Sequence, residues 1–82
     1  MEEYPFLAQA LSETIEVLRS DKRISKSALA DFARLEPRYL REIAQGLKKP
    51  TVNAIYCICE ALDITPAEFF RKVDEKIAAL KS

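Results

Sequence analysis

Apolar side chains recur along most of the chain at spacings of three and four residues, which places them on one face of a helix. Near the N-terminus this stripe, which includes one threonine, consists of Leu7, Leu11, Thr14, Ile15 and Leu18. Near the C-terminus it consists of Phe69, Phe70, Val73, Ile77 and Leu80. With the shorter stripes between them, the pattern predicts five helices, over about residues 5–20, 26–33, 37–45, 52–62 and 66–80.

Capping and helix-breaking residues fall at the ends of these stretches. Ser25, Thr51 and Thr65 suit N-cap positions, because a hydroxyl oxygen can accept a hydrogen bond from a free amide of the first turn. Pro5 suits the first position of its helix, where the missing amide hydrogen costs nothing. Gly46 can adopt the left-handed conformation that ends a helix. The predicted helices are therefore joined by short connections.

Composition narrows the class of protein. The chain has 82 residues, 49% of them apolar, with one glycine and four prolines, so turn signals are too few for a sheet protein. This length predicts a single all-α domain over residues 1–82. No apolar run approaches the ~20 residues of a membrane span, and the acidic start at Glu2 and Glu3 is unlike a secretion signal. We therefore expect a cytoplasmic protein without a membrane partner.

The charges are balanced in total but unevenly distributed. The formal net charge is zero, yet residues 20–50 carry eight basic and four acidic side chains, for a net charge of +4. Residues 1–19 have a net charge of −3 and residues 51–82 a net charge of −1. A basic middle segment between acidic ends is compatible with DNA binding by one face.

The two cysteines do not indicate a metal site. Cys57 and Cys59 are two positions apart in a predicted helix, so they point about 200° apart and cannot form a disulfide with each other. Zinc normally takes four nitrogen or sulfur ligands, and the chain has no histidine. Without histidine or a glycine-rich phosphate loop, the usual signatures of an enzyme are also missing. We therefore expect no metal, no cofactor and no enzymatic activity.

Only residues 34–36 separate the second and third predicted helices, a connection typical of the helix-turn-helix unit. The segments around it are Arg23-Ile24-Ser25-Lys26-Ser27-Ala28-Leu29-Ala30, then Leu40 and Ile43, then Gly46-Leu47-Lys48-Lys49-Pro50-Thr51, and finally residues 55–64. In this ordered set, over roughly residues 19–70, the chain resembles the phage-repressor (Cro/lambda-repressor-like, XRE-type) helix-turn-helix family. The resemblance implies a five-helix DNA-binding fold, with the motif in helices two and three, and a prokaryotic or phage source.

The resemblance also assigns roles to residues. In that family the helix after the turn reads bases in the major groove, and flanking helix ends and loops hold phosphates. The positions implied for base contacts are Pro37, Arg38, Arg41 and Glu42. The positions implied for phosphate contacts are Lys26, Tyr39, Gln45, Lys48 and Lys49. Two alternatives stay open, because Glu42 could instead orient Arg38 from four residues away, and Tyr39 could pack against the edge of the motif.

Four positions depart from the family's usual pattern. Arg34 stands at a turn position commonly filled by glycine, where a positive φ would cost about 1 kcal/mol. Lys26 replaces a frequent glutamine, and Pro37 has no donor to offer a base. Ala44 stands where members often carry a glutamate paired with an arginine of the first helix. The corresponding arginine here is Arg19, which therefore needs another partner.

The apolar stripe of residues 66–80 is larger than the end of a small domain usually buries alone. We therefore predict a homodimer whose interface includes Phe69, Phe70, Val73 and Ile77. The alternative is that this stripe packs entirely on the first helix. A two-fold dimer would place two reading helices about 34 Å apart, to match successive major-groove faces.

Two functions fit these observations. The first is a sequence-specific transcription regulator, a repressor or autoregulator, that binds a palindromic operator in double-stranded DNA. The second is an antitoxin or adaptor that uses the same fold to bind a protein partner. Carboxylates that shield Arg38 and Arg41 would favour the second function, whereas a basic face around the third helix would favour the first.

Overall fold

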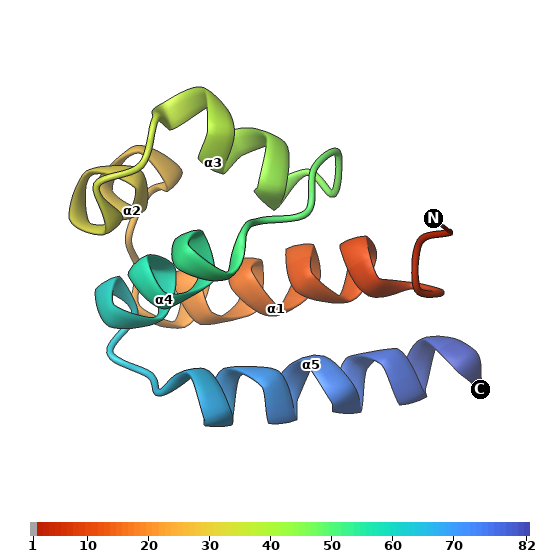
Figure 1. The fold of residues 1–82 in the computed structure, drawn as a ribbon. Coiled ribbons are helices and arrows are strands. Elements are labelled where there is room, and N and C mark those ends of the chain that lie inside the picture. The colour runs from red at the N-terminus through yellow and green to blue at the C-terminus, as the bar shows by residue number, and fades with distance from the viewer. Residues whose placement is uncertain (1) are drawn as a thin grey trace.

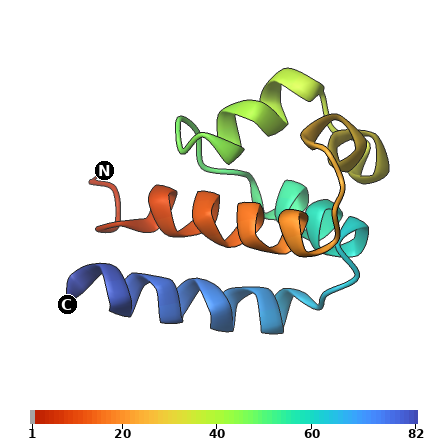
Figure 2. The ribbon, with the colours of Figure 1, turned by 180° about the vertical axis from the view of Figure 1, so that it is seen from behind.

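Five helices lie within residues 2–82, the part of the chain that the computed structural model describes. They are α1 (Leu7–Asp21), α2 (Lys26–Ala33), α3 (Pro37–Ala44), α4 (Val52–Ala61) and α5 (Pro66–Lys81). α1 and α5 run antiparallel along each other, so the two chain ends lie at the same end of this pair (Figure 1, Figure 2). α3 packs on α1 and α2, while α4 packs on α2 and α5. This arrangement leaves α3 at the edge of the molecule farthest from α5.

Every helix contributes its apolar face to one core. The core side chains with almost no exposed surface are Ile15 of α1, Leu29 of α2, Leu40 and Ile43 of α3, Ile58 of α4, and Phe69 of α5. These positions belong to the stripes that the three- and four-residue spacing predicts. α2 and α3 are each only eight residues long, and helices this short depend on tertiary packing for their stability.

Three helices begin at the capping residues that the sequence predicts. The hydroxyl of Ser25 accepts a hydrogen bond from the Ala28 amide at 3.0 Å, and the hydroxyl of Thr51 accepts one from the Ala54 amide at 3.0 Å. The hydroxyl of Thr65 likewise accepts a hydrogen bond from the amide of Glu68 at 3.1 Å. Each bond satisfies an amide that has no partner inside its own helix. These caps therefore fix the starts of α2, α4 and α5.

The start of α1 differs from the prediction, whereas α3 begins at Pro37 as predicted. α1 begins at Leu7 rather than Pro5, because Phe6 takes a left-handed conformation with φ of 65°. Pro5 lies in the turn before the helix, which the amide of Leu7 closes by donating to the carbonyl oxygen of Tyr4 at 3.1 Å. At α3, Glu36 occupies the N-cap position, but its side chain accepts no capping hydrogen bond. Pro37, which has no amide hydrogen, follows it at the first helical position.

The apolar stripe of α5 packs inside this one chain. Phe69, Val73 and Ile77 are 0%, 2% and 8% exposed, because α5 lies along the length of α1. These three side chains fill the core and offer almost no surface to a second subunit, so the prediction that they form a dimer interface is corrected. Phe70 is 38% exposed and stacks edge-on against Phe69, with 5.5 Å between ring centroids.

No helix within residues 2–82 combines the length and the apolar character that a membrane crossing needs.

Candidate nucleic-acid interface

The connection between α2 and α3 is a tight left-handed turn. Arg34 has φ of 58° and ψ of 40°, the conformation that glycine adopts most cheaply. The amide of Leu35 then donates to the carbonyl oxygen of Ala30 at 2.9 Å, which closes the end of α2. The sequence departure at Arg34 is thus accommodated without opening the turn. The connection therefore joins two helices that pack directly on each other.

α3 has one buried side and one exposed side. Leu40, Ile43 and Ala44 are 0%, 1% and 7% exposed, and they hold the helix against α1 and α2. The opposite side carries Pro37, Arg38, Arg41 and Gln45, all of which are exposed. The structure therefore places these four sequence-predicted residues together on the outer face of the helix, as the periodicity requires.

Glu42 lies between two of the predicted DNA contacts. Its Oε2 is 3.8 Å from Nε of Arg38, and its Oε1 is 3.5 Å from Nζ of Lys48. The Glu42 side chain is 25% exposed, whereas that of Arg38 is 81% exposed. The carboxylate therefore lies deeper than the guanidinium that it faces. Of the two alternatives for Glu42, the structure contains the contact that orients Arg38.

Tyr39 connects α3 to the start of α4. Its hydroxyl oxygen accepts a hydrogen bond from the amide of Thr51 at 3.1 Å, and its ring packs against the core. Nζ of Lys48 lies 5.9 Å from the ring centroid, within the range of a cation–π contact. Tyr39 thus packs against the edge of the motif, which is one of the two alternatives that the sequence left open. A phosphate contact from its hydroxyl stays a prediction.

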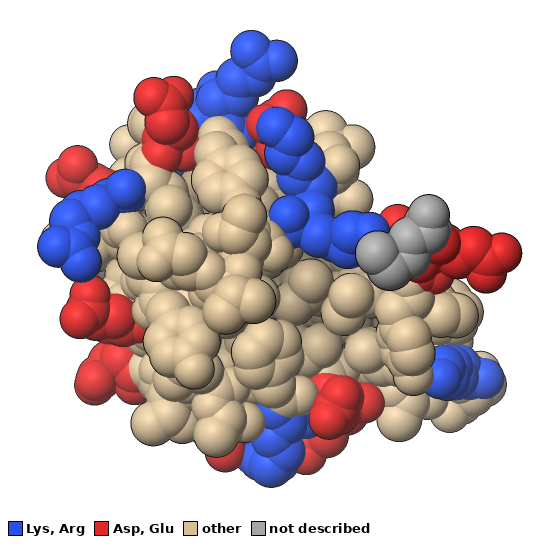
Figure 3. Space-filling view, in the orientation of Figure 1, with Lys and Arg blue, Asp and Glu red and all other residues tan. Residues whose placement is uncertain are grey.

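The two remaining lysines among the predicted phosphate contacts are also paired with acidic groups. Nζ of Lys26 lies 3.8 Å from Oε1 of Glu16, and Nζ of Lys49 lies 3.7 Å from Oε2 of Glu3. Arg41 differs, because within residues 2–82 no carboxylate oxygen lies within 4.0 Å of its guanidinium. Side chains of both signs therefore gather over α3 and the loop that follows it (Figure 3).

Arg19 pairs with Glu16 of its own helix, because Ala44 has no carboxylate to offer. Its Nε donates to Oε2 of Glu16 at 2.9 Å, and its Nη1 donates to the carbonyl oxygen of Ile24 at 2.7 Å. The hydrogen bond to Glu16 raises the pKa of the Arg19 guanidinium above its ordinary value, against the opposing effect of burial. The spacing of three residues on one helix was the signal for this pair in the sequence.

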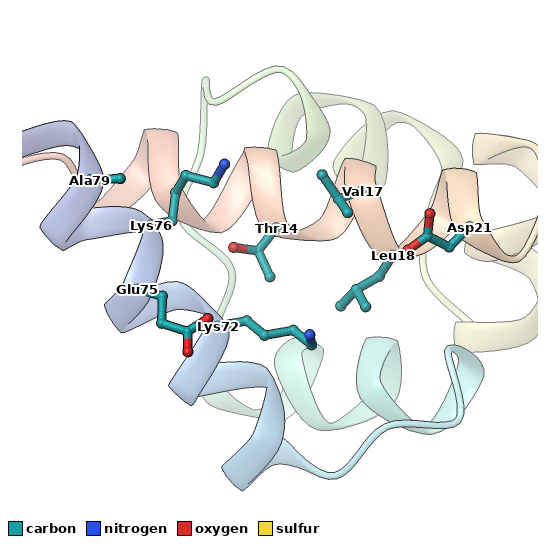
Figure 4. A pocket seen from close by; sticks show the side chains of 8 residues that line it. All are labelled: Thr14, Val17, Leu18, Asp21, Lys72, Glu75, Lys76 and Ala79. Atoms are coloured by element: carbon teal, nitrogen blue, oxygen red, sulfur yellow. The ribbon is translucent and has the colours of Figure 1, made fainter.

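A separate groove of about 260 Å³ lies between α1 and α5 (Figure 4). Its apolar lining comes from Val17, Leu18 and Ala79, and its charged lining from Asp21, Lys72, Glu75 and Lys76. All the predicted DNA contacts lie between residues 26 and 49, so the groove is not part of the candidate interface.

Comparison with known proteins decides the family. Residues 14–75 match the Cro/C1-type HTH DNA-binding domain, a stretch that contains the whole of α2, α3 and α4. The chain belongs to this family. It is therefore a helix-turn-helix DNA-binding regulator and not an enzyme. The predicted resemblance and the predicted all-α fold of five helices are both confirmed.

Solved structures of similar proteins agree with this assignment. The clp gene regulator ClgR from Corynebacterium glutamicum has a TM-score of 0.87 and 26% identity, over 96% of this chain and 84% of that one. The restriction-modification controller protein C.Esp1396I, solved as a tetramer in complex with its natural 35 base-pair operator, shares the fold. Its TM-score is 0.83 and its identity 23%, over 92% of this chain and 99% of that one. No curated protein matches the sequence significantly.

Proposed function

We propose that this protein is a sequence-specific transcription regulator, a repressor or autoregulator, which reads a palindromic operator through α3 in the major groove. The observation that carries the proposal is the two-sided character of α3. Buried Leu40 and Ile43 fix the helix to the core, and Arg38 and Arg41 extend from its outer face. An outward helix with two arginines on a rigid support suits the readout of base edges.

Arg38 and Arg41 are the proposed base readers. They are three residues apart on one helix, so their guanidinium groups leave the same face and can reach neighbouring base pairs. Each planar fork matches O6 and N7 of a guanine, the commonest specific contact in the major groove. Pro37 lies beside them at the start of α3 and offers an apolar surface, which suits the methyl group of thymine.

Phosphate contacts come from residues on both sides of α3. Lys26 is the first residue of α2, where the free amides of the helix N-terminus also favour an anion. Lys48 and Lys49 follow Gly46 in the exposed loop after α3, and the hydroxyl hydrogen of Tyr39 is available as a further donor. Because phosphate contacts set the register but not the sequence preference, these residues position the arginines.

A homodimer would match a palindromic operator. The proposed interface is the corner between α4 and α5, where a surface groove is lined by Tyr56, Cys57, Glu60, Ile64, Thr65 and Pro66. Tyr56 is 58% exposed, and Phe70 follows Pro66 by four residues on the same face of α5. Oligomeric assembly on an operator is also recorded for C.Esp1396I. This corner replaces the buried stripe of α5 as the proposed contact between subunits.

The second candidate function is that of an antitoxin or adaptor that binds a protein partner. The observation that favours it is the pairing of Arg38 with Glu42, together with the exposed apolar side chains Phe32, Leu47 and Val52, which are 61%, 70% and 69% exposed. The exposed guanidinium of Arg41 favours DNA binding instead.

Selection of bound duplexes from a random pool, at two salt concentrations, tests the proposal. The expected result is a palindrome with half-sites about one helical turn apart, and loss of enrichment with Arg41→Ala. Arg71→Ala serves as the matched control, because Arg71 forms its ion pairs with Glu68 and Glu75 along α5. If the intact chain enriches no sequence and weak binding vanishes at the higher salt, a protein partner becomes the better account.

A further inference from the structure

Four of the five cations proposed to contact DNA lie beside a carboxylate of the same chain. The pairs, each with one N–O distance, are Arg38–Glu42 at 3.8 Å, Lys48–Glu42 at 3.5 Å, Lys49–Glu3 at 3.7 Å and Lys26–Glu16 at 3.8 Å. The carboxylates come from three separate places, namely the segment before α1, the middle of α1, and α3 itself. Their common feature is that each one reaches the candidate interface.

We infer that Glu42, assisted by Glu3 and Glu16, is a specificity-determining residue that acts as an internal counter-ion for the DNA-facing cations. The carboxylate holds Arg38 and Lys48 in the free protein and competes with DNA phosphates for them. This inference rests on the proposed function, and it assigns Glu42 a positioning role in place of base readout.

Non-specific DNA binding is the step that such competition weakens most. Binding to an arbitrary duplex comes almost entirely from the neutralisation of phosphates, which releases the ions condensed on them. A lysine that already has a carboxylate beside it must give up that partner to make a phosphate contact. On a cognate operator Arg38 contacts a base edge instead of a phosphate, so its contact with Glu42 can persist and less of this cost is incurred. The internal carboxylates therefore widen the gap between specific and non-specific affinity.

Of the three carboxylates, Glu42 is the one whose position best suits the role of counter-ion. It faces two of the cations, and with 25% of its side chain exposed it is the most buried of the three. Glu16 also faces two cations, but its hydrogen bonds to Arg19 are the closer ones, at 2.9 and 3.1 Å. Glu3 is 50% exposed and faces Lys49 with one oxygen. Glu42 also lies on the reading helix, whose backbone is fixed by the buried Leu40 and Ile43.

Charge balance along the reading helix agrees with this role. Residues 36–45 contain two arginines, Arg38 and Arg41, and two glutamates, Glu36 and Glu42. The net charge of this segment is therefore zero, although residues 20–50 together have a net charge of +4. The attraction of this helix for any duplex is thus smaller than its arginine content alone would give.

The test compares the intact chain with Glu42→Gln, a substitution that removes the charge and keeps the shape. The dissociation constant is measured over a series of salt concentrations, for the selected operator and for a duplex of random sequence. Freeing one cation for a phosphate should steepen the salt slope by about 0.9, which corresponds to roughly eightfold tighter binding at 0.1 M salt. The random duplex should gain this affinity, the operator should gain less, and the ratio of the two affinities should fall.

Two control variants separate this role from a structural one. Glu42→Asp keeps the charge and should preserve most of the discrimination between the two duplexes. Glu75→Gln removes a carboxylate that pairs with Arg71 on α5, away from the interface, and should leave both salt slopes unchanged. Thermal unfolding of each variant shows whether the fold is intact, and a purely structural effect would not change the salt slope.

Two results would overturn the inference while the proposed function stands. The first is an unchanged salt slope and unchanged random-duplex affinity for Glu42→Gln. The second is weaker operator binding with no change on the random duplex, because that result would identify Glu42 as a base reader. If the intact chain selected no operator, the proposed function would fail, and the random-duplex comparison would still decide whether Glu42 competes with phosphates.

Discussion

Replacing Thr14 with valine should stabilise the protein. Thr14 lies in the middle of α1 on the side that faces α5 (Figure 4), and it is 4% exposed. Its hydroxyl oxygen is buried and has no hydrogen-bond partner within residues 2–82. A buried polar group without a partner costs about 1–3 kcal/mol, because it has lost its hydrogen bonds to water and gained none. Valine fills almost the same space with a methyl group in place of the hydroxyl.

The expected gain in the free energy of unfolding is about 1–2 kcal/mol. The lower figure allows for imperfect fit of the added methyl group in a packed core, and threonine and valine have similar helix propensities. For a domain of this size, such a gain raises the melting temperature by roughly 4–8 °C per kcal/mol. Denaturant unfolding would measure the same effect as a higher midpoint with an unchanged m-value.

Thr14→Ser is the matched control for this substitution. Serine keeps the hydroxyl and removes the methyl group, so its free energy of unfolding should fall by about 0.8 kcal/mol or more. Opposite shifts for the two variants would identify the unpartnered hydroxyl as the cause. A lower midpoint for Thr14→Val would show instead that the hydroxyl makes a stabilising hydrogen bond. DNA binding should not change, since Thr14 lines the groove between α1 and α5, which is not part of the candidate interface.

Four further tests address the left-handed turn, the two cysteines and the two sides of α3. Arg34→Gly should raise the free energy of unfolding by about 0.5–1 kcal/mol, because glycine takes the φ of 58° without strain; an unchanged denaturation midpoint would mean that the turn is not strained. Burial raises the pKa of the Cys59 thiol to about 11, from an ordinary value of 9.0. The thiol of the unfolded chain therefore ionises first, and the free energy of unfolding should fall as the pH rises through this interval. Cys59→Ala should not show this loss. A thiol reagent at about pH 8 should modify the half-buried Cys57 well before Cys59, as mass spectrometry would record. Leu40→Ala should cost about 2–5 kcal/mol in unfolding experiments and reduce DNA binding through loss of folding, whereas Arg41→Ala should reduce binding with an unchanged midpoint.

The helix starts show why much of the fold could be predicted from the sequence. A capping hydroxyl and the first turn of a helix are neighbours in the chain, so the signals at Ser25, Thr51 and Thr65 do not depend on distant residues. Phe6 carries no such signal, because a left-handed conformation is unusual for a bulky side chain. Its conformation depends on how the segment before α1 meets the core, which a local pattern does not contain.

The candidate site shows the same division between local and distant information. The outward positions of Arg38 and Arg41 follow from helical periodicity, and the Arg38–Glu42 contact follows from a spacing of four residues. The contact between Glu3 and Lys49 joins residues 46 positions apart in sequence, so no local pattern could have predicted it. The burial of Phe69 was likewise undecided, because an apolar stripe has the same sequence whether it packs on α1 or on a second subunit.

The proposed function rests on the entry of α3 into the major groove of DNA. Nuclear magnetic resonance with the isotope-labelled chain tests it most directly, by following each backbone amide as a selected duplex is added. The largest shifts should fall in residues 36–51 and at the start of α2, with little change along α5. Shifts concentrated on α5 or on the corner between α4 and α5, with α3 unaffected, would contradict it.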